Sequence, residues 1–159
     1  MKILILGLSA SGKTTLGKSL SKLFGVPVIE ADDETRKLNN GVWPSDEKVI
    51  DRYFDVINEW VLKMENVIYI TSWLEKEAIV KFFNNGFKII ELHGKFEKLL
   101  SRRMNRDDPS KLLIKRFKKN YSKYTKIISK PEVTKTTTTS IDVSDLTVEE
   151  LLKKVREVL

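Results

Sequence analysis

The stretch GLSASGKT, Gly7 to Thr14, combines residue types and a spacing that could bind the phosphates of a nucleotide. It satisfies the pattern G-x-x-x-x-G-K-[ST] and lies between an apolar run, Lys2–Leu6, and a segment with helical spacing, Lys13–Phe24. Glycines let backbone N–H groups approach phosphate oxygens, and a helix start adds the positive end of a dipole. The alternative is a glycine-rich turn without a ligand. We call residues 7–14 the cradle.

The positions of the cradle have different expected tasks. Lys13 is expected to reach the β- and γ-phosphates, and the Thr14 hydroxyl is expected to bind Mg²⁺. Further contacts with the nucleotide are expected from Gly7, Ser9, Ala10, Ser11, Gly12 and Thr15. The pattern therefore predicts a nucleoside triphosphate and Mg²⁺ as ligands.

Acidic residues follow a second apolar run, Val26–Ile29. Glu30, Asp32 and Asp33 could approach the transferred phosphate, because neighbouring parallel strands end at the same edge of a sheet. One carboxylate could take the proton of an acceptor hydroxyl, while another holds a magnesium-bound water. The alternative is an acidic helix start in which Asp32 or Asp33 is the N-cap.

The elements that must position these residues alternate between strands and helices. Strands are predicted at Lys2–Leu6, Val26–Ile29, Val67–Thr71, Phe87–Leu92 and Thr138–Val143. Helices are predicted at Lys13–Phe24, Asp46–Met64, Leu74–Phe83, Phe96–Met104, Ser110 to about Ile128, and after a capping box at Thr147–Glu150. This alternation predicts an α/β three-layer sandwich, with a five-stranded parallel sheet and helices on both faces.

Length and composition narrow the class of protein. The 159 residues, 41% of them hydrophobic, fit one domain over residues 1–159. The absence of cysteine excludes disulfides and thiolate metal sites and fits a cytoplasmic protein. The apolar run Ile3–Leu6 is too short for a membrane span, so no membrane contact is expected. Monomer and homodimer both remain open.

The net charge of +7 is concentrated in one segment. Residues 95–130 hold 13 Lys and Arg against 3 Asp and Glu. Such a segment can be a solvated helix face, a footprint for nucleic acid or an arginine lid over polyphosphate. Charge alone does not choose among these three.

Together these residues resemble the small P-loop kinases, the group that includes nucleoside monophosphate kinases, shikimate kinase and gluconokinase. The stretch EADDETRKLNNGVWPSDEKVID is similar to their acceptor-binding segment, here about residues 30–64. The resemblance implies that Asp32 is the general base or a magnesium-shell residue and that Arg36 contacts the acceptor. Further acceptor contacts are expected from Asp33, Trp43 and Ser72. The later stretches TSWLEKEAIVKFF and FKIIELHGKFEKLLSRRMNR resemble gluconokinases.

The stretch NRDDPSKLLIKRFKKNY resembles the helical lid of nucleoside monophosphate kinases, here about residues 102–130. The matching residues are Arg106, Asp107, Asp108 and Arg116. The resemblance implies that Arg106 and Arg116 contact the transferred phosphoryl group, since a planar, permanently charged guanidinium suits its oxygens. It also implies that Arg102 or Arg103 stacks on the adenine. Each arginine could instead be a solvated charge on a basic helix.

The sequence thus predicts a magnesium-dependent kinase that transfers the γ-phosphoryl group of ATP to a small acceptor. Nucleotides or nucleosides are favoured as acceptors over sugar acids and other metabolites. Two alternatives remain: a polynucleotide kinase that binds DNA or RNA through residues 95–130, and a nonhydrolytic nucleotide-binding module. His93, the single histidine, has no partners for a metal site or a catalytic triad and is expected to be structural or peripheral.

Overall fold

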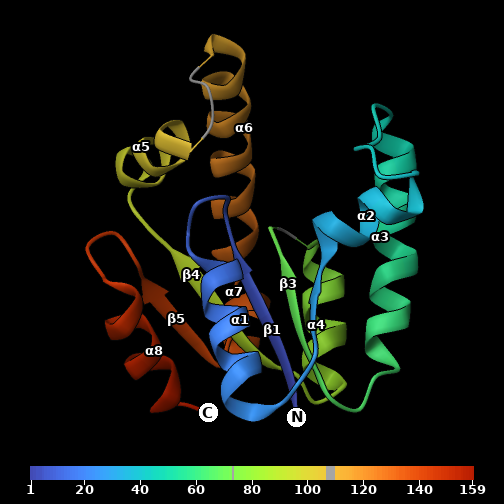
Figure 1. The fold of residues 1–159 in the computed structure, drawn as a ribbon, viewed down its shortest axis with the longest axis vertical. Coiled ribbons are helices and arrows are strands. Elements are labelled where there is room, and N and C mark those ends of the chain that lie inside the picture. Colours follow the sequence, from blue (N-terminus) through green and yellow to red (C-terminus); the bar gives the residue numbers. More distant parts are fainter. Residues whose placement is uncertain (73, 107–109) are drawn as a thin grey trace.

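A computed structural model describes residues 1–72, 74–106 and 110–159. These residues form a five-stranded parallel sheet with the strand order β2-β3-β1-β4-β5 (Figure 1). The strands are β1 (Lys2–Gly7), β2 (Val28–Glu30), β3 (Val67–Thr71), β4 (Lys88–His93) and β5 (Thr139–Asp142). The predicted α/β sandwich with a parallel sheet is confirmed.

The helices cover both faces of the sheet and extend beyond its upper edge (Figure 1). They are α1 (Lys13–Phe24), α2 (Ala31–Leu38), α3 (Glu47–Leu62), α4 (Lys76–Asn84), α5 (Phe96–Arg106), α6 (Lys111–Ile128), α7 (Pro131–Thr136) and α8 (Val148–Arg156). On one face Ile5 of β1 belongs to a buried cluster with α1 and α8. On the other face Leu4 belongs to a cluster with α3, α4 and α7. Side chains of a strand alternate between faces, so an unbroken apolar strand such as β1 is buried on both.

One short helix, α7, was not predicted from the sequence, and another, α2, was expected only as the alternative of an acidic helix start. Helix α2 begins at Ala31, and Glu30 is its N-cap residue, without a side-chain capping bond. Neither Asp32 nor Asp33 is therefore the N-cap; both lie in the first turn, where the helix dipole favours negative charge. Helix α7 starts with Pro131, which suits a first turn because it needs no N–H donor there. The capping box is confirmed: Thr147 N–H donates to Glu150 Oε2 at 2.7 Å, and Glu150 N–H donates back to Thr147 Oγ1.

The carboxyl ends of the strands gather the polar residues. In the parallel register, Leu6 of β1 lies beside Thr71 of β3, and Glu30 of β2 lies beside Ile70. The loop after β1 therefore lies near the ends of β2 and β3, and α2 and α5 stand on either side of that loop (Figure 1). No helix among the described residues has the length and apolar character needed to cross a membrane.

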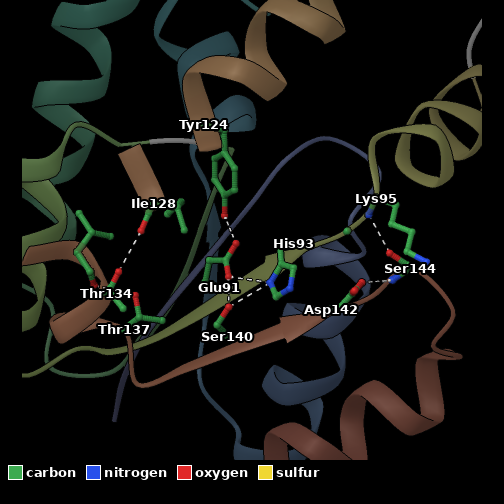
Figure 2. A network of polar contacts seen from close by, with 12 residues as sticks. Glu91, His93, Lys95, Tyr124, Ile128, Thr134, Thr137, Ser140, Asp142 and Ser144 are labelled. Atoms are coloured by element: carbon green, nitrogen blue, oxygen red, sulfur yellow. Dashed lines mark hydrogen bonds and ion pairs between the residues drawn. The ribbon is translucent and has the colours of Figure 1, made fainter. Parts of the chain in front are cut away.

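A separate network of polar side chains lies inside the fold, around the buried carboxylate of Glu91 on β4. Tyr124 of α6 donates to Glu91 Oε1 at 3.0 Å, and Ser140 of β5 donates to Oε2 (Figure 2). The ring of His93 lies 3.0 Å from the same Oε2 through Nδ1. A buried carboxylate is costly unless it is hydrogen-bonded, and these partners satisfy it. The network therefore fastens α6 and β5 to β4.

Candidate active site

The cradle is a tight turn that connects β1 to α1. Ala10 and Gly12 both have positive φ, 68° and 92°, so two residues of the loop are left-handed just before α1 begins. A side chain at Gly7 would place its Cβ 2.6 Å from the carbonyl oxygen of Leu92 and from Ser11 Oγ. The loop therefore needs glycine at position 7 for space and at position 12 for backbone conformation. This turn leaves the start of α1 facing the edge of the sheet.

Lys13 is the central cation of the cradle. Its side chain is buried, and Nζ donates to the carbonyl oxygen of Leu8 at 2.8 Å. Burial lowers the pKa of Lys13 to about 8, while the charges of Asp32 and Glu30 oppose that shift. Arg106 adds to the lowering. A bound phosphate would supply the negative charge that keeps Lys13 protonated.

Thr14 and Glu30 link the cradle to β2. The Thr14 hydroxyl donates to Glu30 Oε2 at 2.8 Å. Together with Asp32, these side chains provide hydroxyl and carboxylate oxygens, which are the ligands that Mg²⁺ prefers. The described residues contain no cluster of three His, Cys, Asp or Glu that could enclose a metal ion. The donor set nevertheless fits Mg²⁺, which usually keeps several waters and binds through one or two carboxylates plus phosphates.

Asp32 and Asp33 differ in their surroundings. Asp32 is half-buried, and burial raises its pKa, against the opposing charges of Lys13 and Arg36. Asp33 is exposed and forms an ion pair of 3.3 Å with Arg36. The guanidinium of Arg36 also lies 5.5 Å from the ring centroid of Trp43. The ion pair and the aromatic ring hold Arg36 at the mouth of the site.

Three arginines of α5 face the cradle and the end of β5. Arg102 donates to the carbonyl oxygens of Val143 and Ser144, at 2.9 and 3.0 Å. Arg103 and Arg106 both donate to the hydroxyl oxygen of Ser9, also at 2.9 and 3.0 Å. Helix α5 thus adds positive charge on the side of the cradle opposite Asp32 and Arg36.

A cavity of about 420 Å³ brings most of the predicted site residues together. The predicted residues that line it are Ser9, Ala10, Gly12, Lys13, Thr14, Thr15, Asp32, Asp33, Arg36, Ser72, Arg102 and Arg106. Its lining also includes Glu30, which the sequence placed near the transferred phosphate, and Arg103, which it offered as a partner of the adenine. Ile70 and Thr71 complete the lining and were not predicted. The sequence could not show that Arg103, and not Arg102, contacts the cradle, because this depends on how α5 is rotated about its axis.

Four predicted residues are not part of the described lining of this cavity. Gly7 and Ser11 lie in the cradle, and Ser11 is buried. Trp43 lies against Arg36, which lines the cavity, and Arg116 of α6 is exposed to solvent. The predicted lid residues Asp107 and Asp108 lie outside the described part of the chain.

Comparison with known proteins shows which family the chain belongs to. The family model for shikimate kinase matches residues 9–159, which includes most of the cradle and all the acidic and basic residues of the site. The chain belongs to the shikimate kinase family. It is therefore an ATP-dependent P-loop phosphotransferase. No curated protein sequence matches the chain.

Solved structures have the same fold. Shikimate kinase from Acinetobacter baumannii, in complex with shikimate, superimposes with a TM-score of 0.78 at 18% identity, over 98% of this chain and 90% of the other. Shikimate kinase from Aquifex aeolicus gives a TM-score of 0.68 at 22% identity, over 99% and 94%. A gluconokinase from Sinorhizobium meliloti gives 0.68 at 19% identity, over 99% and 93%. At these identities the structures show the fold alone.

Family membership corrects the acceptor predicted from the sequence. The matching family is named for shikimate, which is a small hydroxylated acid and not a nucleotide. The prediction that nucleotides or nucleosides are favoured is therefore wrong, and so are the alternatives of a polynucleotide kinase and a nonhydrolytic module. The error came from the basic segment 95–130, because arginines that bind ATP phosphates resemble a nucleotide-kinase lid whatever the acceptor is.

Proposed function

We propose that the protein transfers the γ-phosphoryl group of ATP to a hydroxyl of a small, hydroxylated carboxylic acid. The observation that carries the proposal is the cavity in which Lys13, Asp32 and Arg36 meet. These three side chains can serve the donor, the reacting hydroxyl and the acid group of the acceptor. Residues 30–64 then act as the acceptor segment and residues 102–130 as the lid of one kinase domain.

Arg36 supports a carboxylate on the acceptor. A guanidinium can hold a carboxylate by two parallel hydrogen bonds, and the face of Trp43 limits the directions in which Arg36 can turn. Arg36 already pairs with the exposed carboxylate of Asp33. An acceptor acid would exchange for Asp33 at Arg36, so an anion is the group that this position suits.

Asp32 supports the general-base step. Its carboxylate lines the same cavity as Lys13, and burial raises its pKa toward the range in which it can take a proton. In the proposed step the acceptor hydroxyl gives its proton to Asp32 as its oxygen bonds to the γ-phosphorus. The bond from that phosphorus to the bridging oxygen breaks, and ADP leaves with the electron pair.

The remaining residues hold and neutralise the phosphates. Lys13, Arg103 and Arg106 supply positive charge beside the cradle, where the transferred group must pass. Thr14, Glu30 and Asp32 would hold Mg²⁺ directly or through its waters. When bound, Mg²⁺ would neutralise oxygens of the β- and γ-phosphates.

The experiment is an acceptor panel assayed by ADP release and by the mass of the product. The panel contains hydroxylated acids such as shikimate and gluconate, the matching neutral polyols, and nucleosides with their monophosphates. We expect turnover with at least one acid and at most background rates with the other two groups. A nucleoside or a neutral polyol as the best acceptor would overturn the proposal.

Two matched variants connect that result to Arg36. Arg36→Gln is expected to raise KM for the acid about tenfold or more, with little change in KM for ATP, because it removes a charge-assisted contact with the acceptor. Arg52→Gln, an exposed arginine of α3 outside the described cavity lining, is the control. Equal KM values for Arg36→Gln and the wild type would remove Arg36 from the acceptor site.

A further inference from the structure

Ser9 has an unusual position among the residues of the cradle. Arg103 Nη1 and Arg106 Nη2 converge on its hydroxyl oxygen, at 2.9 and 3.0 Å. The two arginines are three residues apart, so they project from the same face of α5. Ser9 immediately precedes Ala10, whose positive φ turns the loop at this point. One small hydroxyl therefore connects the cradle to both arginines.

After accepting from both arginines, the Ser9 hydroxyl still has one proton to donate. A hydroxyl has two acceptor lone pairs and one donor proton, whereas a guanidinium is only a donor. The two arginines use the acceptor side of Ser9, so its proton must point to a different partner. Ser9 lines the cavity together with Lys13 and Thr14. The partner best suited to that proton is an oxygen of a bound phosphate.

The charges around Ser9 favour the same partner. Two guanidinium groups that meet at one oxygen repel each other, and the positive charge of Arg106 also lowers the pKa of nearby Lys13. The charge of Arg103 also acts across the cavity on Asp32, where it opposes the rise in the pKa of that carboxylate. A polyphosphate would relieve the repulsion among these cations.

We propose that Ser9 is a positioning residue that holds Arg103 and Arg106 over the cradle and connects their placement to the terminal phosphate of the bound nucleotide. In this arrangement Ser9 accepts from both arginines and donates to the nucleotide. Its main effect on binding passes through the arginines, because without the hydroxyl they lose the one acceptor that they share. The inference takes ATP as the phosphoryl donor, as the proposed function does, and it does not depend on the acceptor.

The test is a double-mutant cycle on nucleotide binding, measured by calorimetry with the β,γ-imido analogue of ATP and with ADP, both with Mg²⁺. Ser9→Ala is expected to weaken binding of the analogue about fivefold or more, as for the loss of a hydrogen bond to a charged group. In the Arg103→Gln/Arg106→Gln background the same change is expected to cost clearly less, because only the direct hydrogen bond to the nucleotide is then lost. Binding of ADP, which lacks the terminal phosphate, is expected to change little in any variant.

Two further variants separate positioning from a general effect on the fold. Ser9→Thr keeps the hydroxyl and is expected to bind the analogue like the wild type. Ser19→Ala makes the same chemical change in α1, outside the described cavity lining, and is expected to leave binding unchanged. Each variant is also melted without ligand, so that a loss of folding is seen directly.

The outcomes decide the inference independently of the acceptor. An equal loss from Ser9→Ala in both backgrounds would overturn positioning, because Ser9 would then act on the nucleotide without the arginines. No loss in the wild-type background, or no rescue by Ser9→Thr, would overturn it as well. Failure of the acceptor panel would leave this cycle unaffected, since no acceptor takes part in it.

Discussion

The hydroxyl of Thr14, in the first turn of α1, donates a 2.8 Å hydrogen bond to the carboxylate of Glu30 at the end of β2. This bond places a carboxylate beside the residue of the cradle that is expected to bind Mg²⁺. Glu30 can orient the Thr14 hydroxyl or hold a water of the ion, and either role would make metal affinity depend on its charge.

The first prediction is that Glu30→Gln raises the Mg²⁺ concentration needed for half-maximal ATP binding by about tenfold or more. The reason is that the amide keeps the size of the side chain but loses the negative charge. The measurement is a Mg²⁺ titration at constant ATP. Glu34→Gln is the matched control, because Glu34 is in α2 and pairs with Lys37 outside the described cavity lining. Identical Mg²⁺ curves for Glu30→Gln and the wild type would show that Glu30 has no part in metal binding.

The second prediction is that replacing Lys13 stabilises the fold but removes phosphoryl transfer. The pKa of Lys13 is about 8 in the folded protein, against 10.5 for an ordinary lysine. Between these two pH values the unfolded chain binds a proton that the folded chain does not, so the free energy of unfolding rises with pH across this window. Below about pH 8 Lys13 is charged in both states, and its burial then destabilises the fold.

Lys13→Met should therefore be more stable than the unliganded wild type at pH 7, by about 1 to 3 kcal/mol. It should also lack the rise between pH 8 and 10.5, and it should lose most phosphoryl transfer because no cation reaches the phosphates. Chemical denaturation across this pH range and a turnover assay test both parts. Near-normal turnover by folded Lys13→Met would remove Lys13 from the mechanism.

The third prediction is that Asp32→Asn lowers turnover about a hundredfold or more, with a much smaller effect on ATP binding. The amide cannot take the proton of the acceptor hydroxyl. Since burial raises the pKa of Asp32, the wild-type rate should begin to fall at a higher pH on acidification than an ordinary aspartate would allow. Asp33→Asn is the control, and it should keep this acid limb because Asp33 is exposed. A large loss of turnover in Asp33→Asn, with Asp32→Asn near normal, would show that Asp33 is the general base.

The predictable parts of the fold were those with a local cause. The pattern Lys13–Phe24 matches α1 at both ends, since it follows a glycine-rich turn and stops at Gly25, whose positive φ ends the helix. Helix α7 was missed and α2 was offered only as an alternative, because six and eight residues with few apolar side chains give no reliable helical period. The strand order depends on which elements pack together at long range, so local patterns do not determine it.

The site divides in the same way. The spacing of the cradle is a local property, and the cavity contains Lys13 and Thr14 as expected. The contact of Arg103 with Ser9 is different, because each residue turns a helix by about 100°, and only the packing of α5 determines which of its arginines meet Ser9. The acceptor was predicted wrongly because the basic segment 95–130 resembles a nucleotide-kinase lid, and neither this segment nor the cradle determines which acceptor is bound.

The last prediction compares two arginines that the sequence made equivalent. Arg106 lines the cavity and donates to Ser9, whereas Arg116 is exposed on α6 outside the described lining. An arginine stabilises the transferred group only if its guanidinium reaches the oxygens on which charge accumulates. Arg106→Ala should therefore lower turnover at least about tenfold, while the effect on ATP affinity in the ground state is smaller.

Steady-state rates of Arg106→Ala, Arg116→Ala and Lys118→Ala provide the comparison, with Lys118 as an exposed cation on the same helix as Arg116. From the position seen here, Arg116→Ala should resemble Lys118→Ala and keep near-normal turnover. A loss in Arg116→Ala as large as that in Arg106→Ala, with Lys118→Ala normal, would mean that α6 moves during the reaction. In that case Arg116 would reach the phosphates only after the helix has closed over the cradle, and both arginines would belong to the lid.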